Sequence, residues 1–182
     1  MTADAATEGP DSAEHADPDE ETFSGYRRSD GRLGVRNRIL VLPSVICSHL
    51  VAEEIADRAN RAVAAPHDHG CAQLGADNEQ TKETFLGVGA NPNVAGTVVV
   101  GLGCEHVQSD AVAAEIADRD LPVREVAIQD AGGTEACIEQ GVRAVSELGD
   151  HVEAAARTPS SFGNLTVGIV SDARLALEAL LE

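Results

Sequence analysis

The fold is decided by the stretch Thr97-Val98-Val99-Val100-Gly101-Leu102-Gly103-Cys104-Glu105. Three consecutive valines suit a strand that is covered on both faces, as strands of parallel sheets are. The glycines that follow indicate a sharp loop at the carboxyl end of this strand. Short apolar runs also occur at 38–42, 61–65, 123–128 and 165–170. We expect a strand at each of them.

Amphipathic segments separate these strands. Their apolar spacing predicts helices over 48–61, 77–87, 108–119, 134–148 and 173–181. Apolar strands that alternate with amphipathic helices are typical of the α/β class. We therefore expect three layers, Rossmann-like, in which a mostly parallel sheet of about five strands carries helices on both faces.

The first 24 residues differ from the rest of the chain in composition. They carry eight of its 31 acidic residues, no Lys or Arg, and almost no large apolar residue before Phe23. Such a segment cannot offset the entropy cost of becoming ordered. We expect residues 1–24 to form a disordered acidic tail and residues 25–182 to form a single α/β domain.

The net charge restricts the partners. The 182 residues include 31 Asp and Glu against 13 Lys and Arg, which gives a formal charge of -18. Phosphate backbones and anionic membranes would repel such a chain, so we expect neither nucleic acid nor membrane as a partner. The sequence has no apolar run long enough to cross a bilayer and no secretory signal, which predicts a cytoplasmic protein. An acidic surface with Lys82 as the single lysine is typical of halophilic proteins.

The segment 25–38 reverses this charge. It holds one acid, Asp30, and five arginines: Arg27, Arg28, Arg32, Arg36 and Arg38. Such a cluster either binds an anion or pairs with neighbouring carboxylates.

The residues that can carry chemistry follow the strands. Three of the four cysteines and four of the six histidines lie in the loops at 43–49, 65–73 and 101–106. Parallel strands end at one edge of the sheet, and ligands bind there. We therefore expect the thiols of Cys47, Cys71 and Cys104 to converge. Soft thiolates favour iron, zinc or an iron–sulfur cluster; the alternative is that these cysteines are small buried residues.

Other loop residues offer further possibilities. His67 and His69 lie two residues apart, so both could be ligands or one could be a general base. Gly101-x-Gly103 and Gly132-Gly133-Thr134 precede expected helices and could present backbone N–H groups to an anion. No third glycine completes a dinucleotide fingerprint, so we do not expect nucleotide binding. Cys137 lies inside a predicted helix, where a structural role is expected.

Together these segments resemble the altronate/galactarate dehydratase family of sugar-acid hydro-lyases. The resemblance covers about residues 25 to 170, and the beta subunit of sulfolactate sulfo-lyase is similar over the same region. Its motifs are 25–37, 40–44, 69–71, 91–96, 101–105 and Gln129 with 132–134.

The resemblance implies a metal-dependent enzyme that removes water from a sugar acid to give a 2-keto-3-deoxy acid. It implies iron, as Fe²⁺ or an iron–sulfur cluster, with Mn²⁺ as a further possibility. The metal ligands would be Cys47, Cys71, Cys104 and His69, and the catalytic base would be His69 or Glu105. The anionic sugar acid would be bound by Arg32, Arg36, Asn37, Gln73, Gln129, Gly133 and Thr134.

Members of the family continue well beyond the length of this chain. We therefore expect a complementary subunit that carries the missing segments, a homo-oligomer, or both. Two alternatives stay open: a related carbon–sulfur lyase subunit of the sulfolactate type, and a non-catalytic ligand-binding or regulatory module.

Overall fold

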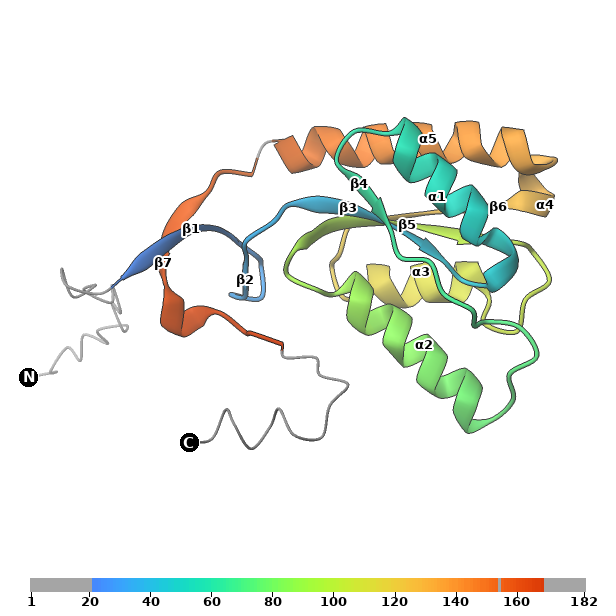
Figure 1. The fold of residues 1–182 in the computed structure, drawn as a ribbon, viewed down its shortest axis with the longest axis horizontal. Helices are drawn as coiled ribbons and strands as arrows, with labels where there is room; N and C mark the ends of the chain where they lie inside the picture. Colours follow the sequence, from blue (N-terminus) through green and yellow to red (C-terminus); the bar gives the residue numbers. More distant parts are fainter. Residues whose placement is uncertain (1–20, 154, 169–182) are drawn as a thin grey trace, which may run out of the picture.

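The computed structural model describes residues 21–153 and 155–168, and its main feature is a four-stranded sheet (Figure 1). The strands are β3 (Arg38–Pro43), β4 (Ala62–Ala64), β5 (Val94–Gly101) and β6 (Val123–Ala127), in the order β4-β3-β5-β6. All of these neighbours pair in parallel. The predicted α/β class and parallel sheet are confirmed.

Helices cover both faces of this sheet (Figure 1). One face carries α1 (His49–Arg58) and α5 (Thr134–Glu153), and the other carries α2 (Ala76–Gly89) and α3 (Ser109–Ala117). Each of these helices was expected from the spacing of apolar residues. A further short helix, α4 (Ile128–Ala131), follows β6 directly and was not expected.

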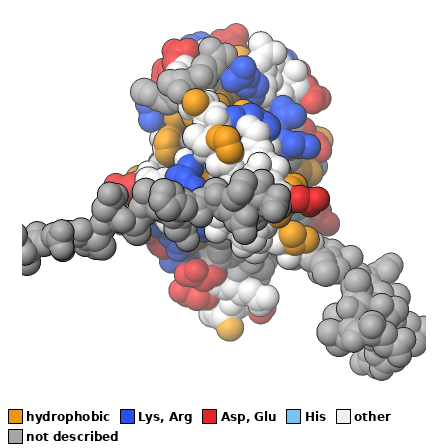
Figure 2. Space-filling view, turned by 90° about the vertical axis from the view of Figure 1, so that its left-hand side faces the viewer, with side chains coloured by type: hydrophobic (Ala, Val, Ile, Leu, Met, Phe, Trp, Pro, Cys, Tyr) orange, Lys and Arg blue, Asp and Glu red, His pale blue; other side chains and the backbone are white. Residues whose placement is uncertain are grey.

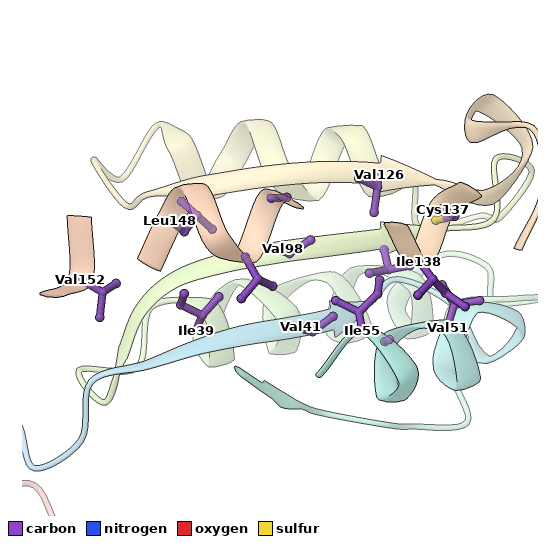
Figure 3. Close-up of a cluster of buried hydrophobic side chains, with 14 residues drawn as sticks. Ile39, Val41, Val51, Ile55, Val98, Val126, Cys137, Ile138, Leu148 and Val152 are labelled. Carbon is purple, nitrogen blue, oxygen red and sulfur yellow. The ribbon is translucent and has the colours of Figure 1, made fainter. Parts of the chain in front are cut away.

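The core forms because alternate residues of the central strands face opposite helix layers. Ile39 and Val41 pack toward α1 and α5 (Figure 3), whereas Leu40 and Leu42 pack toward α2 and α3. The two helices of the first layer approach closely at Gly141, where a Cβ would lie 2.3 Å from Cδ1 of Ile55.

The order of the strands decides where a ligand can bind. The chain runs from β3 to β4 at one side and then returns to place β5 on the other side of β3. The carboxyl ends of β3 and β5 therefore flank the point at which the strand order reverses. Open α/β sheets bind their ligands at such a switch point.

A second, antiparallel sheet was not expected. It consists of β2 (Leu33–Gly34), β1 (Thr22–Arg27) and β7 (Thr158–Ser161), in that order. The ring of Tyr26 lies 5.9 Å from the guanidinium of Arg28 and 4.9 Å from that of Arg157. These cation–π contacts help to hold the small sheet together.

Two predictions need correction. The main sheet has four strands within the described residues, not about five, because the chain leaves α5 to enter the small sheet through β7. Residues 165–168 of the predicted strand 165–170 form no strand; Ile169, Val170 and the predicted helix 173–181 lie outside the described residues.

The second correction concerns the tail predicted to be disordered over 1–24. Residues 1–20 lie outside the described part of the chain, but Thr22–Ser24 are ordered in β1, where they pair with Ser161–Pro159. Local composition cannot reveal a partner strand that is more than 130 residues away. In the part of the chain that the structure describes, no helix has the length and apolarity needed to cross a membrane.

Candidate functional site

Three loops meet at the carboxyl edge of the main sheet. The 3-10 helix η1 (Ile46–Ser48) follows β3, and its first backbone N–H donates to the carbonyl of His69 in the loop after β4, at 2.8 Å. Gly70 in that loop accepts a hydrogen bond from the backbone N–H of Val107, in the loop after β5, at 3.4 Å. The loops after β3, β4 and β5 are therefore joined to one another.

Gly70 lets two of these loops touch. Its φ is +92°, a conformation that favours glycine. A Cβ at this position would lie 2.0 Å from the carbonyl oxygen of Ser44. The N–H of Gly70 donates to Oε1 of Gln73 at 2.9 Å, which fixes the turn that follows. Cys71 is thereby held beside the loop that carries Cys47.

Glu105 joins the loops after β3 and β5. The side chain is buried, at 3% exposure. Its Oε1 accepts the hydroxyl of Ser44 at 2.9 Å, and its Oε2 accepts the N–H of Gly103 at 2.6 Å. Burial alone would raise the pKa of Glu105, but the hydrogen bonds from backbone N–H groups and Ser44 outweigh it and lower the pKa. The ionised carboxylate of Glu105 therefore holds the Cys104 loop and the Ser44 loop together by hydrogen bonds.

The three predicted thiol ligands are all exposed and unoxidised at this edge. Each lies directly beside a residue that ties the loops together: Cys47 follows Ile46, Cys71 follows Gly70, and Cys104 precedes Glu105. Thiolates are soft ligands of the kind that iron accepts. Within the described residues, however, no three His, Cys, Asp or Glu side chains are arranged as ligands of one ion.

Gln129 lies beside one of the cysteines. Its Nε2 donates to Sγ of Cys104 at 3.6 Å, and its backbone N–H donates to the carbonyl of Leu102 at 3.1 Å. Gly103 lies against the Gln129 side chain with a φ of +116°, a conformation that favours glycine. Gly133 and Thr134 follow at the same edge, where α5 begins.

The two histidines of the second loop differ in environment. His67 is half-buried; its Nε2 donates to the carbonyl of Pro43 at 2.6 Å, and its Nδ1 accepts the N–H of His69 at 3.1 Å. The ring packs on Phe85 with centroids 4.6 Å apart. Burial lowers the pKa of His67, so a neutral ring positions the loop. The side chain of His69 is exposed.

His69 and Gln73 also line a cavity of about 540 Å³ between the second loop and α2. Sequence reasoning identified these two residues but missed the part of the wall that α2 supplies. The sequence signal for this wall was the set of uncharged polar side chains Gln80, Thr81 and Thr84, of which Thr81 is buried.

The predicted substrate-binding arginines lie at the opposite edge. Arg32 and Arg36 precede β3, whereas Cys47 follows it. The strand is six residues long, which separates the two ends by about 17 Å. The structure does not bring these arginines, or Asn37, to the three cysteines. Figure 2 looks at this amino end of the molecule, where Lys and Arg side chains gather on the upper half of the face.

These basic residues hold the connecting segment in place. Arg32 Nε pairs with Asp30 at 2.7 Å, and Arg32 also donates to the carbonyl of Ala90 at 2.7 Å. Asn37 accepts a hydrogen bond from Arg28 at 2.9 Å and donates to the carbonyl of Val152 at 2.9 Å. The cluster therefore pairs with carboxylate, amide and carbonyl oxygens of its own chain.

Cys137 lies apart from the site. It is fully buried in the core beside Val126 and Ile138 (Figure 3). Burial, with a smaller contribution from the charge of Glu125, raises the pKa of the thiol to about 11. A protonated, inaccessible thiol fits the structural role expected for this cysteine.

Comparison with known proteins gives a family match. Residues 25–153 match the family described as "D-galactarate dehydratase/Altronate hydrolase, second domain". No solved structure matches the chain significantly.

Three curated relatives are similar. The altronate dehydratase of Bacillus subtilis is 31% identical over 81% of this chain, and that of Escherichia coli is 30% identical over 79%. The (2R)-sulfolactate sulfo-lyase subunit beta of Chromohalobacter salexigens is 44% identical over 44% of the chain. The match covers 31% of each altronate dehydratase and 21% of the sulfo-lyase subunit.

Proposed function

Since the chain belongs to the D-galactarate dehydratase/altronate hydrolase family, we propose that it forms part of a lyase that dehydrates a sugar acid to a 2-keto-3-deoxy acid. The observation that carries this proposal is the joining of three cysteine-bearing loops at the carboxyl edge of the sheet. This edge is where an α/β fold of this topology binds its ligand.

Dehydration of a sugar acid needs a base that removes the proton next to the carboxylate. His69 has this role in the proposal, because its ring is exposed at the joined loops and histidine exchanges protons near neutral pH. His67 supports the role, since its Nδ1 accepts the backbone N–H of His69 and so fixes the loop.

Glu105 was the other predicted base. Its carboxylate is buried and accepts hydrogen bonds from Ser44 and Gly103. These contacts favour a positioning residue that holds the Cys104 loop, and the proposal gives Glu105 that role. Gln73, Gln129, Gly133 and Thr134 lie at the same edge and would hold the hydroxyl and carboxylate groups of the substrate.

Iron is the metal that this donor set suits, as Fe²⁺ or in an iron–sulfur cluster, with Mn²⁺ as a further candidate. Cys47, Cys71 and Cys104 would hold it; His69, the fourth predicted ligand, is left out of this set because an imidazole bound to the metal could not also act as the base. When bound, the metal would act as a Lewis acid toward the substrate carboxylate and the departing hydroxyl.

Partner chains are part of the proposal. The chain spans about a third of the altronate dehydratases that it matches, and one relative is named as a subunit. Arg32, Arg36 and Asn37 lie at the opposite edge of the sheet from the cysteines. In the proposal they therefore contact a substrate that is bound at the cysteine edge of a different chain. A complementary subunit, a homo-oligomer, or both would bring the two edges together.

A second candidate is a carbon–sulfur lyase acting on sulfolactate. The 44% identity over 81 residues to the sulfo-lyase subunit favours it. The two reactions share the removal of a proton next to a carboxylate and differ in the leaving group, which is water in one and sulfite in the other.

The test is an anaerobic assay with altronate, galactarate and sulfolactate, with and without candidate partner chains. We expect 2-keto-3-deoxy acid from a sugar acid, or sulfite from sulfolactate. His69→Gln should lower the rate at least about a hundredfold, while Glu79→Gln, at an exposed position away from the cysteine loops, should retain most of it. The proposal fails if no combination gives either product, which would leave the non-catalytic binding module.

A further inference from the structure

The cavity beside α2 has walls of two kinds. Its base is apolar and includes Leu42, Phe85 and Val88. Its polar side consists of His67, His69, Gln73, Asp77, Gln80, Thr81 and Thr84. At about 540 Å³ it lies within the range of small-molecule sites, which combine apolar surface with a few polar groups.

The charges in this lining disfavour an anionic ligand group and favour a neutral, hydroxylated one. No Lys or Arg lines the cavity, and Asp77 is its one acidic residue. The nearby Lys82 does not compensate, because its Nζ pairs with Glu115 at 2.8 Å. A carboxylate in the cavity would face the like charge of Asp77, with no Lys or Arg in the lining to offset it. Hydroxyl groups would meet amide and hydroxyl side chains that both donate and accept.

The cavity is lined in part by the loop after β4, which carries Cys71. Gln73 follows Cys71 by two residues, so their Cα atoms lie within about 7.6 Å of each other. Oε1 of Gln73 accepts the N–H of Gly70 at 2.9 Å, which leaves the amide NH₂ as a donor on the cavity wall. A chain-like ligand can therefore lie in the cavity and extend to the cysteine loops.

We propose that this cavity binds the uncharged, hydroxylated end of the substrate and so selects sugar acids with one carboxylate over those with two. The inference rests on the proposed function for the identity of the substrate. An aldonate such as altronate places its carboxylate at the cysteine loops and its neutral end against α2. Galactarate carries a second carboxylate, which would meet Asp77.

Binding to the full chain tests this without any turnover. The probes are galactitol, altronate and galactarate, followed through the backbone amide NMR signals of the ¹⁵N-labelled protein. Galactitol and altronate should shift the signals of Gln73, Thr81 and Thr84 in a saturable way. Galactarate should bind about tenfold more weakly than altronate, because its second carboxylate meets the like charge of Asp77 and the lining holds no Lys or Arg to offset it.

The decisive variant is Asp77→Asn, with Glu79→Gln as its matched control. Both residues are exposed acids in the first turn of α2, but only Asp77 lines the cavity. Asp77→Asn should reduce the preference for altronate to threefold or less, whereas Glu79→Gln should leave it unchanged. The inference is overturned if galactitol gives no saturable shift, if galactarate binds as tightly as altronate, or if the two variants behave alike.

Binding and turnover separate the two proposals. The chain could bind altronate selectively and yet form no product with any candidate partner chain. That result would count against the proposed dehydratase activity but not against the cavity. Dehydration without galactitol binding would count against the cavity alone.

Discussion

Ser44 and Glu105 connect the two central strands of the sheet at their carboxyl ends: the Ser44 hydroxyl donates to Oε1 of Glu105 at 2.9 Å. Ser44 follows β3, and Glu105 lies in the loop that follows β5. Both side chains are buried, and Gly101 makes room for the carboxylate, since a Cβ there would lie 2.6 Å from Oε1. The edge that carries the cysteines is thus braced by its own hydrogen bonds.

Glu105→Gln tests this brace. The amide cannot replace all the charge-assisted hydrogen bonds, so the free energy of unfolding at pH 7 should fall by about 1–3 kcal/mol. The pKa of Glu105 is lowered in the folded chain, so its stabilisation is complete above the ordinary value of 4.5 and is lost as the pH falls below it. In urea unfolding, the difference in free energy of unfolding between Glu105→Gln and the parent chain should disappear below pH 4.5. The exposed Glu79→Gln should show no such gap, and equal stability of Glu105→Gln and parent at pH 7 would contradict the brace.

Gly70→Ala tests the contact between the first two loops. The positive φ and the 2.0 Å approach to Ser44 leave no room for a methyl group. We expect a loss of about 2 kcal/mol or more in thermal or urea unfolding. The same substitution at Gly87, which is exposed in α2 with nothing near its Cβ, should stabilise the chain by about 0.5–1 kcal/mol. Equal effects at the two glycines would refute the close approach.

His67→Gln tests the neutral histidine under the loop. The glutamine amide can still donate to Pro43, but it does not titrate. Because burial lowers the pKa of His67, the unfolded chain binds a proton first as the pH falls below the ordinary value of 6.5. The parent chain should therefore lose stability there, by up to about 1.4 kcal/mol per pH unit, which the variant should not. The difference in free energy of unfolding between the parent chain and His67→Gln should become smaller from pH 8 to pH 5.5. A constant difference would show that His67 has the same pKa in the folded and unfolded chains.

Thiol labelling separates the two classes of cysteine. In the metal-free native chain an aromatic disulfide reagent at pH 8 should react with three of the four thiols, since Cys137 alone is buried and its pKa is raised to about 11. The fourth should react only after unfolding in urea. Cys137→Ser should keep three reactive thiols, and native labelling of all four would contradict the core position of Cys137.

Local sequence patterns predicted the four strands of the main sheet, together with a further strand at 165–170 whose described residues form none. The strands at 38–42 and 97–100 and the helix from 134 are apolar or amphipathic runs of ordinary length, and these patterns do not depend on distant residues. The small sheet was missed because β1 and β7 are rich in polar residues and β2 has only two residues. Their pairing, together with the stacking of Tyr26 on Arg157, joins distant parts of the chain.

The part of the site that depends on the order of the strands was also predicted. Residues that follow parallel strands must share one edge, which brought the loops of Cys47, Cys71 and Cys104 together. Arg32 and Arg36 were assigned to that edge through a family resemblance, although they precede β3 and therefore lie at its other end. The polar wall that α2 gives the cavity depends on how the helix packs, which residue spacing alone did not reveal.

Iron binding after anaerobic reconstitution tests the central claim, that the three thiols at the carboxyl edge serve one metal site, most directly. Bound iron and sulfide would be measured on the full chain and on single serine variants of its four cysteines. The account predicts bound iron in the parent chain and in Cys137→Ser, and loss of most of it in Cys47→Ser, Cys71→Ser and Cys104→Ser. A colourless, iron-free parent chain whose three exposed thiols all remain reactive would contradict it.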